Sequence, residues 1–243
     1  MLLGVPLTVG FNAARFWTSS RIVGVNHSFP SSLYVTLVSM AANILPVPGG
    51  VAVRITALKA RESTYRGAIG ITAVTAALWV AGALALAGTM LILERHAVLG
   101  GILLVGGSLG IGACIAAFRL MGAAWGDCGM LCLLQVFMLS VDGARLWLCL
   151  QAIGIHAEWT AGAFLTVSSV AGSMVGVAPG GMGVRELVSA LIAPLVLLEP
   201  EAAFLATAFN RLCGIAVLGF VSLVLSSSVW KRGEPEVEDD SGN

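Results

Sequence analysis

Two stretches of the chain end in an arginine that follows a helix-breaking Pro-Gly-Gly tripeptide. Residues 48–54 read Pro-Gly-Gly-Val-Ala-Val-Arg and residues 179–185 read Pro-Gly-Gly-Met-Gly-Val-Arg, so the arginines are Arg54 and Arg185. Proline lacks an amide donor and glycine accepts unusual backbone angles, so each tripeptide interrupts a helix. The free amides that open the next helix attract anions, and a guanidinium presents a planar fork suited to phosphate. The repeated motif therefore predicts two elements that recognise a phosphate-bearing group; the alternative is that both arginines extend to the membrane interface or pair within the protein.

Four further ionisable residues lie within apolar sequence. Asp142 and Arg145 are three residues apart and share one face of a helix. They are expected either to neutralise each other or to line a cavity as a pair that opens when a substrate arrives. Glu186 is expected either to cap the helix that begins after the second break or to answer a charge elsewhere. Arg211 has no acid nearby in the sequence, so its expected partner is Asp142 or Glu186.

The composition is that of a membrane protein. Of 243 residues, 58% are hydrophobic and 11% are charged, whereas soluble domains carry about 25% charged residues. Thirteen basic residues balance thirteen acidic ones, so no basic surface for nucleic acid is indicated. We expect an all-α fold, a polytopic transmembrane helix bundle over residues 1–230, followed by a charged, disordered cytoplasmic tail over 231–243.

No cofactor or metal site is predicted. The five cysteines lie in or beside apolar runs without metal-type spacing, and the three histidines are scattered. No set of nucleophile and base is evident, so an enzyme is not expected, although Glu186 and Asp142 keep an intramembrane lipid-modifying activity open.

Long apolar segments cover residues 67–93, 97–121, 129–151 and 202–230, each long enough to span a bilayer. Regions 33–58 and 160–198 instead contain shorter arms on either side of a Pro-Gly-Gly break. Only fourteen residues precede Arg15, fewer than the ~20 of a spanning helix. The chain is therefore expected to begin inside a helix that has been truncated. Glycines at small-xxx-small spacing, Gly106 and Gly110, predict close helix packing.

Loop charge distinguishes two topologies. If every arm spans, Arg15, Arg21 and Arg95 lie outside. If both broken regions are re-entrant hairpins, Arg15 and Arg21 become cytoplasmic and four arginines lie at depth: Arg54, Arg145, Arg185 and Arg211. The hairpin topology fits the positive-inside bias better, but it buries four charges. It also makes the two halves an inverted repeat, in which substrate sites typically form between matched broken helices.

These residues resemble the lysylphosphatidylglycerol synthase transmembrane-region family. The resemblance rests on Asn43-Ile44-Leu45-Pro46 leading into the first break, on residues 179–186, and on Asn210-Arg211-Leu212, and it covers roughly residues 10 to 230. The family's first motif usually has an acidic residue near the second glycine, whereas Val51 and Ala52 stand here.

The resemblance implies a flippase-like membrane domain that handles lipids. In the best-known members, a separate cytosolic domain attaches an amino acid to phosphatidylglycerol, and that aminoacyltransferase domain is not seen here. Stand-alone relatives are linked to glycolipid, polyprenyl-lipid or hopanoid pathways, so the resemblance leaves the lipid open.

The sequence thus predicts a multi-pass protein of the prokaryotic cytoplasmic membrane, with its C-terminus in the cytoplasm, that binds and flips a polar, anionic lipid. The alternative is a non-transporting membrane partner of a lipid- or glycolipid-modifying enzyme. A homodimer or a complex with such an enzyme is the expected assembly. The predicted substrate-binding residues are Asn43, Pro48, Gly49, Gly50, Arg54, Asp142, Arg145, Pro179, Gly180, Gly181, Gly183, Arg185, Glu186 and Arg211.

Overall fold

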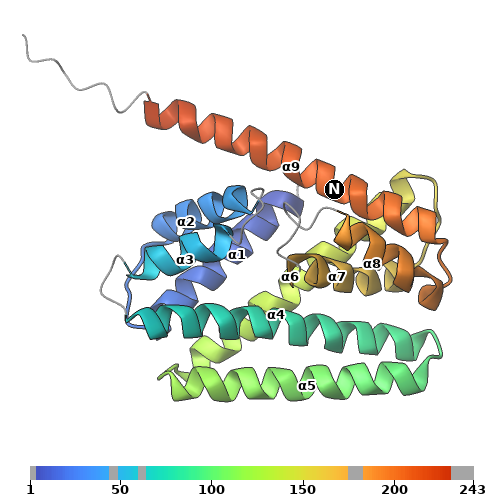
Figure 1. Ribbon diagram of the computed structural model, residues 1–243, viewed down its shortest axis with the longest axis horizontal. Helices are drawn as coiled ribbons and strands as arrows, with labels where there is room; N and C mark the ends of the chain where they lie inside the picture. Colours follow the sequence, from blue (N-terminus) through green and yellow to red (C-terminus); the bar gives the residue numbers. More distant parts are fainter. Residues whose placement is uncertain (1–3, 44–48, 60–63, 175–182, 231–243) are drawn as a thin grey trace, which may run out of the picture.

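The computed structural model describes residues 4–43, 49–59, 64–174 and 183–230, and these residues are almost entirely helical (Figure 1). The all-α prediction is confirmed. The helices are α1 (Gly4–Ile22), α2 (Phe29–Ala42), α3 (Gly49–Lys59), α4 (Tyr65–Leu93), α5 (Ala97–Leu120), α6 (Trp125–Ala152), α7 (Trp159–Met174), α8 (Val184–Ile192), a 3-10 turn η2 (Ala193–Val196) and α9 (Pro200–Trp230).

Four helices of the described chain, α4, α5, α6 and α9, are long and apolar enough to cross a membrane. They match the four apolar segments expected from the sequence. The chain is an integral membrane protein, because these helices also leave large apolar side chains on the outside, among them Leu109, Val98 and Leu212.

The two regions with Pro-Gly-Gly breaks form pairs of short helices. Helix α2 packs on α3, and α7 packs on α8. Neither helix of the first pair, with 14 and 11 residues, reaches the ~20 residues of a spanning helix. Pro48, Pro179, Gly180 and Gly181 lie outside the described residues, whereas Gly49 and Gly50 open α3.

The two halves of the chain repeat one arrangement. Helix α1 packs on α2, α2 on α3 and α3 on α4, as α6 packs on α7, α7 on α8 and α8 on α9. The turns after α1 and α6 form the same hydrogen bonds, which the turns after α4 and α5 also form: the N–H of Gly24 donates to Arg21 and that of Val25 to Ser20, as Gly154 donates to Gln151 and Ile155 to Leu150. Both glycines have positive φ, which glycine adopts without strain.

Each half has its own apolar core. One cluster, which includes Phe16, Ile71 and Phe118, lies among α1, α3, α4, α5 and α6. The other, which includes Leu146, Leu165 and Ala203, lies among α4, α6, α7, η2 and α9. In Figure 1 the short helices of the first half and those of the second stand on opposite sides of α6, between α4 and α9. This arrangement leaves a polar region between the two cores.

Helices α4 and α5 pack closely through glycines. A Cβ at Gly107 would lie 2.5 Å from the backbone nitrogen of Ala85, and one at Gly100 would lie 2.8 Å from the carbonyl oxygen of Gly88. The packing predicted at Gly110 is confirmed, since a Cβ there would meet Ala81 at 2.9 Å. The same prediction for Gly106 is wrong, because nothing lies within 4 Å of its Cβ position.

Candidate functional site

Glu186 links the start of α8 to α9. Its Oε2 accepts a hydrogen bond from the N–H of Gly183 at 2.9 Å, and its Oε1 accepts one from Nη1 of Arg211 at 2.7 Å. Only 3% of Glu186 is exposed. Both roles expected for Glu186 are confirmed, because it caps its own helix and also pairs with a distant charge. Gly183 fits the cap because its φ is +83°.

Asp142 and Arg145 form the ion pair expected on α6. Nη1 of Arg145 lies 3.6 Å from Oδ1 of Asp142, and Nη2 donates to the backbone carbonyl of Asn210 in α9 at 3.4 Å. Arg145 also packs on Gly4 of α1, where a Cβ would lie 2.7 Å from its Cδ. The pair therefore lies where α1, α6 and α9 meet.

Arg54 is held by α2 through a short chain of hydrogen bonds. Its Nε donates to the hydroxyl of Ser39 at 3.2 Å, and that hydroxyl donates to the carbonyl of Gly50 at 2.9 Å. The side-chain oxygen of Asn43 accepts from the N–H of Gly50 at 3.0 Å, so it satisfies an amide in the first turn of α3. No carboxylate of the described residues forms an ion pair with Arg54.

Arg185 lies close to the charges of α6 and α9. Its Cβ packs against α7 at Gly172, where an added Cβ would lie 2.8 Å away. It is within electrostatic range of Asp142, Arg145, Glu186 and Arg211, and its buried Nε has no hydrogen-bond partner. An arginine nitrogen without a partner in a protein interior marks capacity to bind an anion.

Arg15 is a member of this site that the sequence prediction missed. The two predicted topologies counted Arg15 among the charges outside the membrane or in the cytoplasm, whereas the structure places it within α1 with 6% of its surface exposed. Its Nη1 donates to Oε1 of Gln135 at 3.1 Å and its Nη2 to Oδ1 of Asn12 at 3.2 Å, while its Nε has no partner. Arg15 is within electrostatic range of Arg54 and Asp142.

A signal for Arg15 was present in the sequence. Residues 12–17 read Asn-Ala-Ala-Arg-Phe-Trp, and residues 142–147 read Asp-Gly-Ala-Arg-Leu-Trp. Arg15 is therefore the counterpart of Arg145, in a repeat that begins earlier in each half than the Pro-Gly-Gly breaks. The apolar run before Arg15 is too short for a full span, which made the arginine look like a loop residue.

The structure brings these charges into one site through Asp142. Arg54 interacts with Arg15, Arg15 with Asp142, and Asp142 with Arg185. No direct contact between Arg54 and Arg185 is recorded among the described residues, so the two arginines share a site without touching. We call this set the arginine cluster: Arg15, Arg54, Arg145, Arg185, Arg211, Asp142 and Glu186.

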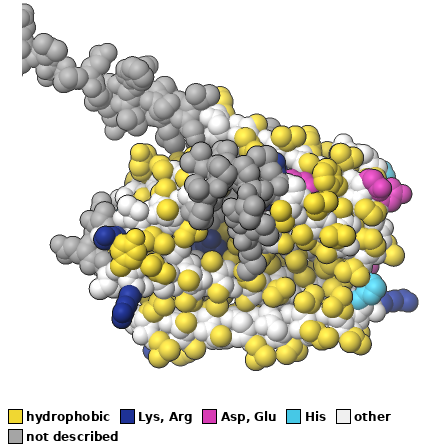
Figure 2. All heavy atoms as spheres, in the orientation of Figure 1, with side chains coloured by type: hydrophobic (Ala, Val, Ile, Leu, Met, Phe, Trp, Pro, Cys, Tyr) yellow, Lys and Arg dark blue, Asp and Glu magenta, His cyan; other side chains and the backbone are white. Residues whose placement is uncertain are grey.

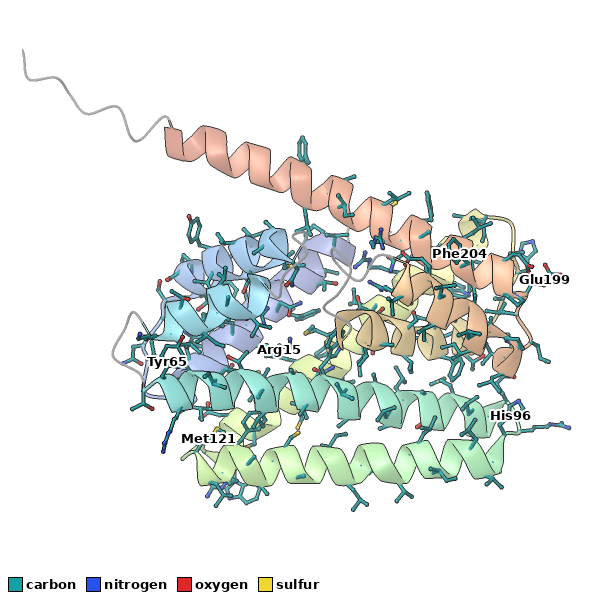
Figure 3. The ribbon with its side chains drawn as sticks, in the orientation of Figure 1. Arg15, Tyr65, His96, Met121, Glu199 and Phe204 are labelled. Carbon is teal, nitrogen blue, oxygen red and sulfur yellow. The ribbon has the colours of Figure 1, made fainter. Side chains whose placement is uncertain are left out.

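The arginine cluster carries five guanidinium groups and two carboxylates, and it draws on α1, α3, α6, α8 and α9. Figure 3 shows Arg15 projecting from α1 into the interior between the two halves. In the space-filling view, atoms of basic side chains are also visible near the centre of the face (Figure 2). An interior with more positive than negative charge is suited to binding an anion.

Comparison of the chain with protein-family models, with curated proteins and with solved structures found no match. The resemblance drawn from the motifs therefore stays a prediction. Among the described residues, no group of histidine, cysteine, aspartate and glutamate side chains is arranged to hold a metal ion.

The Glu186–Arg211 pair can be tested by removing one charge or both. Glu186→Gln keeps an acceptor for the N–H of Gly183 but leaves Arg211 without its carboxylate. Because breaking a buried ion pair costs about 3–5 kcal/mol, we expect a clear fall in the melting temperature of the detergent-solubilised protein. Glu186→Gln/Arg211→Gln should recover most of the loss.

Glu199→Gln is the matched control, because Glu199 directly precedes α9 and is exposed. It should leave the melting temperature unchanged. Equal stability of Glu186→Gln and the wild-type protein would contradict a structural role for the pair.

Proposed function

We propose that this protein binds a polar, anionic lipid through the arginine cluster and moves it across the cytoplasmic membrane, as the family resemblance implies. The observation that carries the proposal is the excess of buried positive charge within a membrane-embedded bundle. Five arginines and two acids share the site, so two carboxylates leave three guanidinium charges unbalanced.

The energetics favour an anionic ligand. A single charged side chain at the bilayer centre costs about 2.5–3.5 kcal/mol on insertion scales. An unbalanced group of guanidinium ions is more costly, since the ions also repel one another at low dielectric. A phosphate that enters the site supplies negative charge and accepts hydrogen bonds from the unpartnered Nε atoms of Arg15 and Arg185.

An apolar groove beside the arginine cluster supports a lipid as the source of that phosphate. It has a volume of about 370 Å³ and lies between α1, α2 and α9, with a lining of Val5, Pro6, Val9, Gly10, Phe29, Leu33, Leu37, Val217 and Leu218. The volume is within the range of small-molecule sites. Such a lining suits an acyl chain and offers nothing to a soluble anion.

The groove and the charges are joined by α1 and α9. Gly4, which contacts Arg145, directly precedes Val5 of the groove. On α9, a Cβ added to Gly214 would lie 3.5 Å from Nη2 of Arg145. Val217, which lines the groove, follows about one helical turn later. A lipid can therefore place its head group at the arginine cluster while one acyl chain lies in the groove.

The first test removes the two arginines that follow the breaks. In liposomes with labelled phosphatidylglycerol, Arg54→Ala/Arg185→Ala should lower the rate of lipid scrambling at least about tenfold, since each arginine contributes charge-assisted hydrogen bonds to the head group. Arg66→Ala/Arg95→Ala is the matched control, because both arginines are exposed.

Unchanged scrambling in Arg54→Ala/Arg185→Ala would overturn the proposed transport. No scrambling by the wild-type protein, together with copurification of a lipid-modifying enzyme, would instead favour the non-transporting partner.

The second test fills the groove. Gly10 lines the groove and nothing lies within 4 Å of its Cβ position, so Gly10→Phe adds a bulky side chain at the groove from a Cβ that meets no neighbour. It should lower scrambling several-fold while the protein stays folded. Gly101→Phe is the control, because Gly101 on α5 is also partly buried and has equal space. Equal activity of the two variants would show that the groove holds no part of the substrate.

A further inference from the structure

The two halves of the arginine cluster differ in their acidic residues. On α1, Asn12 precedes Arg15 by three residues, and on α6 Asp142 precedes Arg145 by the same interval. After the breaks, Ile55 follows Arg54, whereas Glu186 follows Arg185. Both carboxylates of the cluster therefore belong to the second half, and the first half has neutral residues at the matching positions.

The contacts follow this difference. Arg145 and Arg211 each have a carboxylate, at 3.6 Å from Asp142 and 2.7 Å from Glu186 respectively. Arg15 is only 6% exposed, yet its two hydrogen-bond acceptors, Gln135 and Asn12, are both neutral. Two of the three unbalanced charges of the site, Arg15 and Arg54, therefore lie in the first half, and the third, Arg185, lies in the second.

Unused hydrogen-bonding groups lie at the same place. Nε of Arg15 and Nε2 of Gln135 are both buried and have no hydrogen-bond partner. Gln135 has an exposure of 3%. Two unsatisfied donors beside an unpaired guanidinium are costly in a protein interior, and an anion with several acceptor oxygens satisfies all of them at once.

We propose that Arg15 and Arg54 form the subsite that takes the phosphodiester group of the lipid, whereas two of the three arginines of the second half, Arg145 and Arg211, are paired with its own carboxylates. The inference rests on the proposed function and assigns the anion to one half of the repeat. The charged groups that act on Arg15 are Arg54, which repels it, and Asp142, which attracts it but is already paired with Arg145.

In this subsite Asn12 has a specific role. A neutral amide at this position holds a guanidinium nitrogen in place without competing for its charge. A carboxylate at the same position would pair with Arg15 as Asp142 pairs with Arg145, and it would repel an incoming phosphodiester. Asn12→Asp replaces the amide nitrogen, which donates to the carbonyl oxygen of Thr8 at 3.0 Å, by a carboxylate oxygen. It therefore adds one negative charge next to Arg15 at the cost of one hydrogen bond, with no change in side-chain size.

The experiment is a thermal-shift titration of the full chain in detergent with short-chain phosphatidylglycerol, with phosphatidylcholine of equal chain length and inorganic phosphate as separate arms. Phosphatidylglycerol should raise the melting temperature of the wild-type protein more than phosphatidylcholine does. For Asn12→Asp, the phosphatidylglycerol concentration that gives half the shift should rise at least about tenfold. Asp142→Asn should not weaken the response.

Asn12→Asp should keep a melting temperature close to that of the wild-type protein without anionic lipid, because the counter-charge it gives Arg15 offsets the lost hydrogen bond to Thr8. Arg15→Gln is the second variant, and it tests the subsite independently if Asn12→Asp does not fold. It should likewise weaken the response to phosphatidylglycerol. A shift with inorganic phosphate that Asn12→Asp abolishes supports the subsite with a soluble phosphate as its ligand.

A response of Asn12→Asp and Arg15→Gln within about twofold of wild type would overturn the inference while leaving the proposed function in place. Failure of the wild-type protein to prefer phosphatidylglycerol over phosphatidylcholine would instead overturn the proposed function itself.

Discussion

The arrangement of this protein depends on one electrostatic constraint: arginine charges that lie inside a membrane bundle must be balanced. Water is absent from the hydrocarbon layer, so each guanidinium needs a carboxylate, a carbonyl, an amide oxygen or a ligand. The second half meets the need with Asp142, Glu186 and the carbonyl of Asn210. The arginines of the first half instead have Gln135 of α6, Asn12 and Ser39 as acceptors, none of which carries a charge.

The repeated architecture explains how the charges come together. Each half supplies one helix with a buried arginine, Arg15 or Arg145, and one short helix with a second arginine, Arg54 or Arg185. Separate apolar cores hold the two halves, and the charges lie between them. Because the two halves differ in their acidic residues, Arg145 and Arg211 of the second half have carboxylates, whereas Arg15 and Arg54 of the first half have none.

Much of the fold could be predicted from hydropathy, because a spanning helix is a local property of about 20 residues. The segment 67–93 corresponds to α4 (Tyr65–Leu93) and 202–230 to α9 (Pro200–Trp230). The ion pair of Asp142 with Arg145 was also predictable, since residues three apart share a helix face. The choice of Glu186 over Asp142 as the partner of Arg211 was not, because it depends on how α8 packs against α9.

Arg15 and the groove show why the remainder required coordinates. The burial of Arg15 depends on Gln135, which lies far away in the sequence on α6, and on the packing of α1 against that helix. The groove is formed by apolar residues of three helices, α1, α2 and α9, and such residues are abundant throughout the chain. The shape of the groove depends on the spaces between the helices. The identity of a single residue says little about those spaces.

The central claim is that the arginine cluster is completed by an anionic lipid. Native mass spectrometry of the protein purified directly from its membrane tests it most directly. The account predicts a retained anionic phospholipid that stays bound when zwitterionic lipids are removed by detergent. A protein that is stable and folded but carries no anionic lipid, or carries zwitterionic lipid alone, would contradict it.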